Sequence, residues 1–485
     1  MAKLFGTDGI RGHAGEFPLD SATVRVLGSS LTAHLSEKLE NHAPVIVIGR
    51  DTRESGAWLE QAFIEGATRA GAQCKSAGVI TTPGVAFLAR TLPADAGVVI
   101  SASHNPYQDN GIKIFSPSGK KLEDATECLI EADIFAAVGQ PEASGVDAPR
   151  RENRRENKHE EAARLRERYL SFLAAEIGSG LSLNGLTIVI DCANGAASNL
   201  APDLMMRLGA RVIAINNHPD GRNINHNCGS LHIEGLQGRV VEEHADLGVA
   251  FDGDADRALF VDADGNFVDG DAALWALAKY LDARGELKHG IVVATVMSNI
   301  GLEIALRSRG LRLVRTDVGD KYVLEELLRT GATLGGEQSG HLIFPGLSLA
   351  GDGMITTLCL LRAMSEGGNR QARMLLDGGL TEQERVEAAR FRRSKLHELT
   401  AGFNRYPQVL MNVKVREKKP FSEIESVQAA TREIEQKLGE RGRLLLRYSG
   451  TESLARVMIE GENQSEIEEY ATRIASAIRE SIGVS

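Results

Sequence analysis

The stretch GVVISASHNPYQDNGIKIF, residues 97–115, changes character within a few positions. Residues 97–100 are apolar and β-prone, which is typical of a buried strand. Residues 101–106 are polar, tightly turned and unsuited to a core. Asn110-Gly111 is a strong tight-turn signal, and we expect it to fold residues 112–115 back as a second strand. The stretch therefore predicts a strand that ends in a polar loop and then returns.

Other parts of the chain repeat the first half of this pattern. Polar or glycine-rich loops follow each of the apolar, β-prone runs 45–48, 186–190, 247–251 and 291–296. Amphipathic segments, such as 57–70 and 201–208, lie between the runs. Strands that alternate with helices predict α/β layers with mainly parallel pairing. Because such sheets bind ligands beyond the carboxyl ends of their strands, the polar loops are the candidate sites.

The bulk composition excludes several classes of protein. At 485 residues the chain is too long for one core, and about three domains are expected. A net charge of −11 argues against general nucleic-acid binding. There is no apolar run of ~18 residues for a membrane helix, and the N-terminus lacks an apolar signal core. Five scattered cysteines indicate a reduced, cytoplasmic protein without structural zinc.

Two segments look like domain boundaries. Residues 138–168 lose apolar periodicity and then carry dense mixed charge, which predicts a solvated linker and a helix start. A second polar segment, 377–403, precedes a small α+β unit. Its predicted elements are a strand (408–415), a helix (424–438), two strands (443–447 and 454–460) and a helix (464–482).

The strongest metal signal is the run FDGDADR, residues 251–257. Asp252, Asp254 and Asp256 alternate on a loop directly after an apolar strand, where they would repel one another without a cation. Hard oxygen ligands of this kind suit Mg²⁺. An EF-hand is rejected because its sixth position is Arg257, not glycine, and its twelfth is Ala263, not glutamate. Since Mg²⁺ usually completes its shell with water or phosphate oxygen, the triad implies a phosphate.

Ser103 is the candidate carrier of that phosphate, although alone it would be an ordinary turn serine. Lys113 lies on the strand face opposite Ile112 and Ile114 and can return toward the serine loop. A desolvated lysine with a lowered pKa can act as a proton shuttle. His104 competes for that role, and a structural histidine bonded to the backbone is an equal alternative.

Two further loops carry groups that suit a polar ligand. One, residues 335–341, places Glu337, Ser339 and His341 among glycines, which suits a polyhydroxylated molecule. The other offers a guanidinium, hydroxyls and turn amides, the donors that a phosphate needs; its residues are Arg447, Ser449, Gly450 and Thr451. Considered alone, the first loop could be a plain hairpin and the second a surface turn.

Taken together and in order, the motifs resemble the α-D-phosphohexomutase family over nearly the whole chain. They are FGTDGIRG, GRDTR, SASHNP, FDGDADR, GEQSGH and RYSGTE. The resemblance implies an α/β fold of three related domains with mixed sheets and a smaller α+β C-terminal domain, arranged around a central cleft. The expected domains are 1–155 (phosphoserine loop, with a linker from about 138), 156–265 (metal), 266–385 (sugar loop) and 386–485 (phosphate clamp).

The resemblance also implies roles for residues. Ser103 would be a phosphoserine that donates and recovers a phosphoryl group, and its phosphate would join Asp252, Asp254 and Asp256 around one Mg²⁺. Glu337 and Ser339, with His341 beside them, would contact the sugar. The phosphate clamp would comprise Arg447, Ser449, Gly450 and Thr451, and further active-site positions match Arg11, His104, Lys113 and Arg257.

Within the family, FGTDGIRG, GEQSGH and the stretch TVMSNIGLE (residues 295–303) are most similar to the branch that interconverts glucosamine 6-phosphate and glucosamine 1-phosphate. The implied intermediate and primer is glucosamine 1,6-bisphosphate, and the product would feed bacterial cell-wall precursors. Ala255, Ser453 and the long 138–168 segment depart from the pattern of that branch. The expected partner is a small sugar phosphate, with no nucleic acid or membrane, and the chain would be a monomer or a homodimer.

Three alternatives stay open. Another sugar specificity of the same family, that of a phosphomannomutase or phosphoglucomutase, would need the same motifs. A phosphatase with Asp252 as nucleophile and Asp254 as acid would leave the serine loop and the clamp unexplained. A non-catalytic sugar-phosphate-binding regulator would have no need for both Ser103 and three metal carboxylates.

Overall fold

The computed structural model describes residues 3–6, 8–39, 42–137, 154–366, 395–449 and 452–484. Its contacts divide the chain into two compact units, one formed by Met1–Val296 with Val314–Ala401 and the other by Met297–Leu313 with Gly402–Ser485. Among the helices of the described ranges, none is long and apolar enough to cross a membrane.

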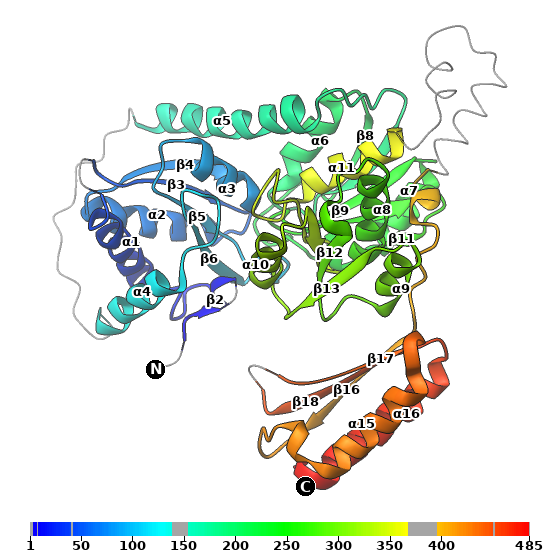
Figure 1. Ribbon diagram of the computed structural model, residues 1–485. Helices are drawn as coiled ribbons and strands as arrows, with labels where there is room; N and C mark the ends of the chain where they lie inside the picture. Colours follow the sequence, from blue (N-terminus) through cyan, green and yellow to red (C-terminus); the bar gives the residue numbers. More distant parts are fainter. Residues whose placement is uncertain are drawn as a thin grey trace, which may run out of the picture. The chain divides into compact units, whose positions relative to one another are not determined.

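The first sheet of the larger unit has six strands in the order β1-β2-β6-β5-β3-β4. Its helices α1, α2 and α4 pack together on one face and bury Leu27, Phe63 and Ile130 against the strands (Figure 1). Helix α3 lies on the other face, where Val85 and Ala89 contact Gly97. The elements are β1 (Phe5–Gly6), β2 (Gly9–His13), α1 (Ser21–Ser36), β3 (Val45–Arg50), α2 (Gly56–Arg69), β4 (Gln73–Val79), α3 (Thr82–Thr91), β5 (Ala96–Ile100), β6 (Asp109–Phe115) and α4 (Asp124–Ala137).

The second sheet has five strands in the order β11-β10-β9-β7-β8. The long helix α5 precedes it, and Figure 1 shows α5 running from the first α/β layer to the second. The elements are α5 (Arg154–Phe172), β7 (Thr187–Asp191), α6 (Ala197–Arg207), β8 (Arg211–Ile215), α7 (Glu234–Glu242), β9 (Leu247–Phe251), β10 (Ala258–Asp262) and β11 (Phe267–Val268).

The third sheet has four strands in the order β13-β12-β14-β15. Buried runs such as Ile291–Thr295 form its centre, as expected for strands covered on both faces. The elements are α8 (Gly270–Ala283), β12 (Ile291–Thr295), α9 (Ile300–Ser308), β13 (Arg312–Thr316), α10 (Asp320–Thr330), β14 (Leu334–Gly336), β15 (Leu342–Ile343), α11 (Gly353–Glu366) and α14 (Lys395–Thr400).

One strand order recurs in the three sheets. Each contains the series β-α-β-α-β-β with neighbours β6-β5-β3-β4, β10-β9-β7-β8 and β15-β14-β12-β13. In every case the last strand returns antiparallel to the strand before it. The expectation of three related α/β domains with mixed sheets is confirmed, and the serine, metal and sugar loops occupy the same position, the connection of that final hairpin.

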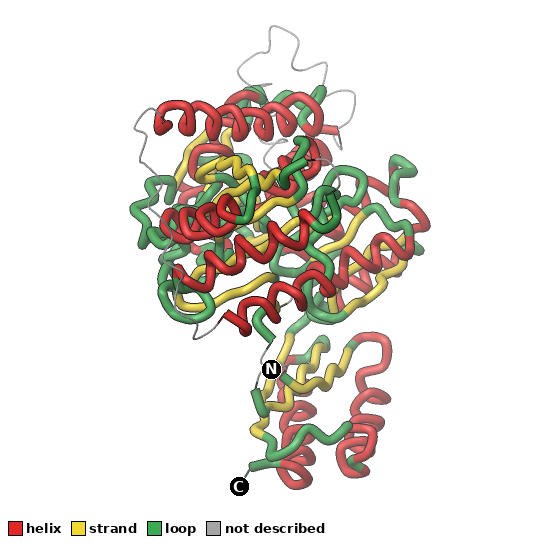
Figure 2. Tube along the Cα trace, turned by 90° about the vertical axis from the view of Figure 1, so that its left-hand side faces the viewer, coloured by secondary structure: helices red, strands yellow, loops and turns green. Residues whose placement is uncertain are grey.

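The C-terminal unit contains a three-stranded antiparallel sheet in the order β16-β18-β17. Helices α15 and α16 cover one face of it, as Figure 2 shows, and Val457, Ile434 and Ile474 belong to their common core. The bounds are β16 (Gln408–Lys414), α15 (Glu425–Leu438), β17 (Arg443–Tyr448), β18 (Leu454–Glu460) and α16 (Gln464–Ile482). The predicted small α+β unit is confirmed.

One local prediction is wrong. Asn110 and Gly111 lie inside strand β6, so the chain turns earlier, within residues 101–108. The Asn110 amide donates to Ser55 Oγ at 2.7 Å, and a Cβ at Gly111 would lie 2.6 Å from the Ser101 carbonyl oxygen. The pair is therefore selected by close packing of two strands and not by a tight turn.

The predicted boundary segments are described only in part. Residues 138–153 and 367–394 lie outside the described ranges, whereas residues 154–168 belong to helix α5, as the predicted helix start requires. The boundaries proposed at 155, 265 and 385 stay predictions.

Candidate active site

The loop that joins β5 to β6 presents Ser103 in a buried, left-handed conformation. Its φ angle is 51° and only 1% of the residue is exposed. The Ser103 N–H donates to Ser101 Oγ at 2.9 Å, and its carbonyl oxygen accepts from Arg53 Nη2 at 2.9 Å and from Asn225 Nδ2 at 2.8 Å. Since a non-glycine residue rarely adopts positive φ, these bonds hold Ser103 in a conformation that it would otherwise avoid.

Arg53 is the scaffold of that loop. Its guanidinium is buried and donates to Asp51 Oδ2 at 2.9 Å. It also donates to the carbonyl oxygens of three loop residues, Ser103 at 2.9 Å, Asn105 at 2.8 Å and Pro106, and to that of Asp109, the first residue of β6, at 3.1 Å. The GRDTR motif therefore shapes the serine loop from within. This role could not be predicted from the sequence, because nothing local shows that an arginine will be buried.

The loop between β9 and β10 brings the predicted carboxylates together. Asp252, Asp254 and Asp256 are all buried, and one ligand atom from each lies within 4.8 Å of the others. Oδ1 of Asp254 and Oδ1 of Asp256 are buried without a hydrogen-bond partner among the residues that the structure describes. Burial, and then the carboxylates of Asp256 and Asp254, raise the pKa of Asp252 well above its usual value. Unpartnered oxygens and mutual repulsion are what a divalent cation would relieve, so these residues fit a metal ion.

Ser103 lies against this triad. Its Oγ donates to Asp252 Oδ2 at 2.5 Å and lies 3.2 Å from Nδ1 of His104. Burial, with Arg257 and Arg11 nearby, lowers the pKa of His104 to about 4, so the imidazole is neutral near pH 7. A neutral imidazole beside a hydroxyl can exchange a proton with it.

Lys113 is buried among three carboxylates, with Nζ 2.9 Å from Asp254 Oδ2, 3.0 Å from Asp8 Oδ2 and 3.5 Å from Asp256 Oδ2. Burial by itself would lower the pKa of Lys113, but Asp254, Asp8 and Asp256 outweigh it and raise that pKa well above its ordinary value. The lowered pKa expected from the sequence is therefore wrong, and the reason is the ion pairing that accompanies desolvation.

Arg11 contacts the serine loop, and Arg257 contacts the carboxylates of the metal loop. Arg11 is paired with Asp8, and its Nη1 lies 3.4 Å from the Ala102 carbonyl oxygen. Nε of Arg257 lies 3.8 Å from Asp256 Oδ1 and 4.0 Å from Asp252 Oδ2. Both residues line a cavity of about 450 Å³, as do His104, Glu337 and His341.

The loop between β14 and β15 supplies Glu337, Ser339 and His341. Glu337 Oε1 accepts from the Gly319 N–H at 3.2 Å, and Glu337 Oε2 accepts from Ser339 Oγ at 3.2 Å. His341 is buried and lies 3.5 Å from Asp256 Oδ2 through Nδ1. Burial would lower the pKa of His341, but Asp256 and other nearby carboxylates raise it to about 9. This loop is therefore joined to the metal loop by an ion pair.

Six side chains form a closed ring of alternating charge beside the triad. In order round the ring they are Lys113, Asp8, Lys121, Asp320, His341 and Asp256. Its shortest links are those of Lys121 Nζ, 2.7 Å from Asp8 Oδ1 and 2.8 Å from Asp320 Oδ1. Asp8, Lys121 and Asp320 were not singled out in the sequence, because no local pattern connects positions so far apart along the chain.

The clamp residues belong to the C-terminal unit. Arg447 lies near the end of β17, and Ser449 follows it, with its N–H donating to the Leu454 carbonyl oxygen at 2.8 Å. Gly450 and Thr451 lie outside the described residues. The roles of all the site residues stay predictions, although the structure brings Ser103, the triad and the sugar loop together within the larger unit.

Comparison with known families gives the class of protein. Models of four domains of phosphoglucomutase/phosphomannomutase match the chain: α/β/α domain I at residues 2–139, domain II at 167–265, domain III at 269–379 and the C-terminal domain at 410–477. The chain belongs to this family.

Relatives that span the full chain carry one particular name. Proteins called phosphoglucosamine mutase are 48% identical in Solibacter usitatus, with all of both chains covered, and 46% identical in Koribacter versatilis, with 100% of this chain and 98% of the relative covered. The relative of the same name in Deinococcus radiodurans is 45% identical, with 99% of this chain and 98% of the relative covered.

Solved structures show the same fold. A phosphoglucomutase/phosphomannomutase family protein from Burkholderia thailandensis has a TM-score of 0.74 at 20% identity, with 99% of each chain covered. An N-acetylphosphoglucosamine mutase from Aspergillus fumigatus, solved in complex with GlcNAc-6P and magnesium, has a TM-score of 0.58 at 20% identity, with 98% of this chain and 95% of that chain covered. The likeness supports the four-domain α/β architecture.

Proposed function

We propose that the chain interconverts glucosamine 6-phosphate and glucosamine 1-phosphate through phosphorylated Ser103. The observation that carries this proposal is the placement of the Ser103 hydroxyl 2.5 Å from Asp252 Oδ2, inside a triad with unpartnered carboxylate oxygens. A hydroxyl in that position can carry a phosphoryl group whose oxygens face the same cation as the carboxylates. The names of the full-length relatives support glucosamine phosphate as the substrate.

The reaction consists of two phosphoryl transfers. In the first, the bond between Ser103 Oγ and phosphorus breaks and a bond from phosphorus to O1 of glucosamine 6-phosphate forms, while the O1 proton passes to the leaving Ser103 Oγ. The 1,6-bisphosphate then turns around. In the second transfer the bond between O6 and phosphorus breaks, a bond from phosphorus to Ser103 Oγ forms, and the Oγ proton passes to O6. Such transfers require mainly positioning and charge neutralisation.

The residues of the chain supply both requirements. Arg257 and Lys113 place positive charge beside the serine and metal loops, and His104 can exchange a proton with a hydroxyl there. Glu337 and Ser339 would bind sugar hydroxyls, and Arg447 with Ser449 would bind the substrate's phosphate. A bound Mg²⁺ would neutralise the oxygens of the transferring phosphoryl group.

The reaction would take place in the cytoplasm, since all five cysteines are free thiols. The product would feed amino-sugar nucleotides for cell-wall precursors. Two rival functions remain distinguishable by experiment: an aspartyl phosphatase with Asp252 as nucleophile, and a regulator that binds sugar phosphates without turnover.

Mass spectrometry and kinetics test the proposal on the same preparation. A fraction of the purified chain should be heavier by one phosphate group, located in the Ser103 peptide and stable to hydroxylamine, which cleaves an aspartyl phosphate. Ser103→Ala should lose about 10⁴-fold or more in mutase rate even with bisphosphate present. Ser179→Ala, at an exposed serine, is the control and should be fully active. Normal turnover by Ser103→Ala would exclude the covalent mechanism.

The substrate is tested by comparing kcat/KM for the 6-phosphates of glucosamine, glucose and mannose. Contacts to the 2-amino group should favour glucosamine 6-phosphate in the transition state. A clear preference for mannose or glucose 6-phosphate would assign the chain to another specificity of its family.

A further inference from the structure

Thr82, the first residue of helix α3, contacts the metal loop twice. Its N–H donates to the carbonyl oxygen of Asp254 at 3.0 Å, and its hydroxyl donates to Oδ2 of Asp254 at 2.6 Å. The residue is only 3% exposed. Thr81 fixes the start of the helix, since its Oγ1 accepts from the Gly84 N–H at 3.1 Å. A rigid helix end of the first α/β domain thus holds a carboxylate of the second.

The two oxygens of Asp254 have different surroundings. Oδ2 accepts from Thr82 Oγ1 and from Lys113 Nζ, at 2.6 and 2.9 Å. Oδ1 is buried and has no hydrogen-bond partner among the described residues. The carboxylate is therefore held through Oδ2, whereas Oδ1 is left without a partner, in a residue that has one ligand oxygen within 4.8 Å of those of Asp252 and Asp256.

We propose that Thr82 is a positioning residue for the divalent-cation site. Its hydroxyl holds Oδ2 of Asp254, so that Oδ1 faces the cation. Lys113 cannot do this alone, because its ammonium group is shared with Asp8 and Asp256 and so does not fix one orientation of Asp254. Removal of a group that orients a metal ligand commonly weakens metal binding by about 10- to 100-fold. The inference rests on the metal site of the proposed function.

Direct titration with Mn²⁺ tests the proposal. The full-length chain is dephosphorylated, no sugar is added, and free Mn²⁺ is measured by electron paramagnetic resonance. Thr82→Val removes the hydroxyl and keeps the shape of the side chain, and it should weaken Mn²⁺ binding by about 10- to 100-fold. The Mg²⁺ concentration for half-maximal activity should rise by a similar factor.

A second pair of variants isolates the hydroxyl. Thr82→Ser and Thr82→Ala both lack the methyl group and differ only in the hydroxyl. Thr82→Ser should therefore bind Mn²⁺ with an affinity within about threefold of that of the original chain, and Thr82→Ala should be weakened as much as Thr82→Val. If circular dichroism shows that Thr82→Val does not fold, the difference in Mn²⁺ affinity between Thr82→Ser and Thr82→Ala tests the role of the hydroxyl. Thr32→Val is the matched control, because Thr32 is buried and, among the described residues, its hydroxyl donates only to the Gly28 carbonyl oxygen in α1, at 2.8 Å.

The outcomes separate this inference from the proposed function. Equal Mn²⁺ affinity of the original chain and of the Val and Ala variants would overturn the role of Thr82 and leave the metal site intact. An original chain that binds no Mn²⁺ would overturn both the metal assignment and the inference. Loss of affinity in Thr32→Val as well would show a general effect of lost packing and would also overturn the role of Thr82.

Discussion

At the scale of residues, the serine loop depends on one buried guanidinium. Arg53 donates to the carbonyl oxygens of three residues of the loop and of Asp109, where β6 begins. A lysine would keep the charge but has three donors on a single nitrogen instead of five in a planar fork. A lysine cannot donate to Asp51 and to all four carbonyl oxygens at once, so several charge-assisted hydrogen bonds would be lost, each worth about 1.5–3 kcal/mol.

We therefore predict that Arg53→Lys destabilises the chain by about 2–5 kcal/mol and lowers kcat by about 10²-fold through misplacement of Ser103. Urea unfolding and the mutase assay measure the two effects. Arg222→Lys is the control: this arginine pairs with Glu54 at 2.7 Å but is 67% exposed, so its effect should stay within about 0.5 kcal/mol. Equal unfolding midpoints for the two variants would contradict the prediction.

Candidate site residues could be predicted from the sequence where several reactive side chains lie within one short motif. Asp252, Asp254 and Asp256 repel one another within five residues of chain, so their purpose could be inferred locally. Arg53 and Thr82 could not be found in this way, because their partners lie 50 or more positions away. The prediction of a lowered pKa for Lys113 was wrong for the same reason, since that pKa is raised by carboxylates from two other loops.

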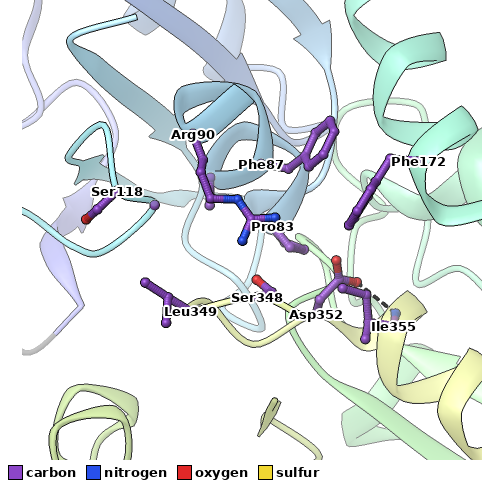
Figure 3. A pocket seen from close by; sticks show the side chains of 11 residues that line it. Pro83, Phe87, Arg90, Ser118, Phe172, Ser348, Leu349, Asp352 and Ile355 are labelled. Atoms are coloured by element: carbon purple, nitrogen blue, oxygen red, sulfur yellow. Dashed lines mark hydrogen bonds between the residues drawn. The ribbon is translucent and has the colours of Figure 1, made fainter. Parts of the chain in front are cut away.

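At the scale of elements, helices α5 and α11 meet at a buried hydrogen bond. Tyr169 of α5 donates to Asp352 Oδ2 at 2.7 Å, and Asp352 also accepts from the N–H groups of Met354 and Ile355 at the start of α11. Figure 3 shows Asp352 among side chains from α3, α5 and α11. The rings of Phe87 and Phe172 stack beside it, with centroids 4.4 Å apart. Helices α3, α5 and α11 therefore pack together around the buried carboxyl group of Asp352.

This buried carboxyl group should make stability depend on pH. Burial raises the pKa of Asp352 to about 6, above the value near 3.9 expected in the unfolded chain. The folded state thus binds this proton more tightly, and the stabilisation is fully present below about pH 4 and is lost as the pH rises through 6. The free energy of unfolding of the original chain, minus that of Asp352→Asn, should fall by about 2–3 kcal/mol between pH 4 and pH 7. A difference that does not change over this range would contradict the assignment.

The elements themselves could be read from the sequence because apolar runs and amphipathic segments are local signals. The strand Leu247–Phe251 and the helix Gln464–Ile482 have the predicted bounds. The turn predicted at Asn110-Gly111 was wrong, because the pair lies inside β6 and serves its contact with β5 and β2, and a contact with β2 joins segments far apart in the chain.

At the scale of the whole molecule, the ring of alternating charge ties three domains of the larger unit together. Lys121 is its most important link, since without it the carboxylates of Asp8 and Asp320 would face each other. The three side chains are 20–27% exposed, so we expect removal of Lys121 to cost about 1–3 kcal/mol, between the values for surface and fully buried ion pairs. Lys121→Met should therefore lower the free energy of unfolding by about that amount and weaken substrate binding.

Thermal unfolding and KM measure the two effects of Lys121→Met. Lys120→Met is the matched control, because Lys120 is exposed beside it and should have an effect within about 0.5 kcal/mol. Equal melting temperatures for the two variants would mean that the ring contributes little to the joining of the domains.

The shared strand order of the three α/β domains allows their loops to evolve separately. Each domain exposes its loop from the same point of the same scaffold, so a change that rewrites one loop leaves the sheets beneath the other two untouched. Descendants of this chain can therefore alter the loop of Ser103, the loop of Asp252–Asp256 or the loop of Glu337 one at a time, in separate mutational steps. Natural selection is then free to explore new substrates through the loops, while it must conserve the strands that aim them.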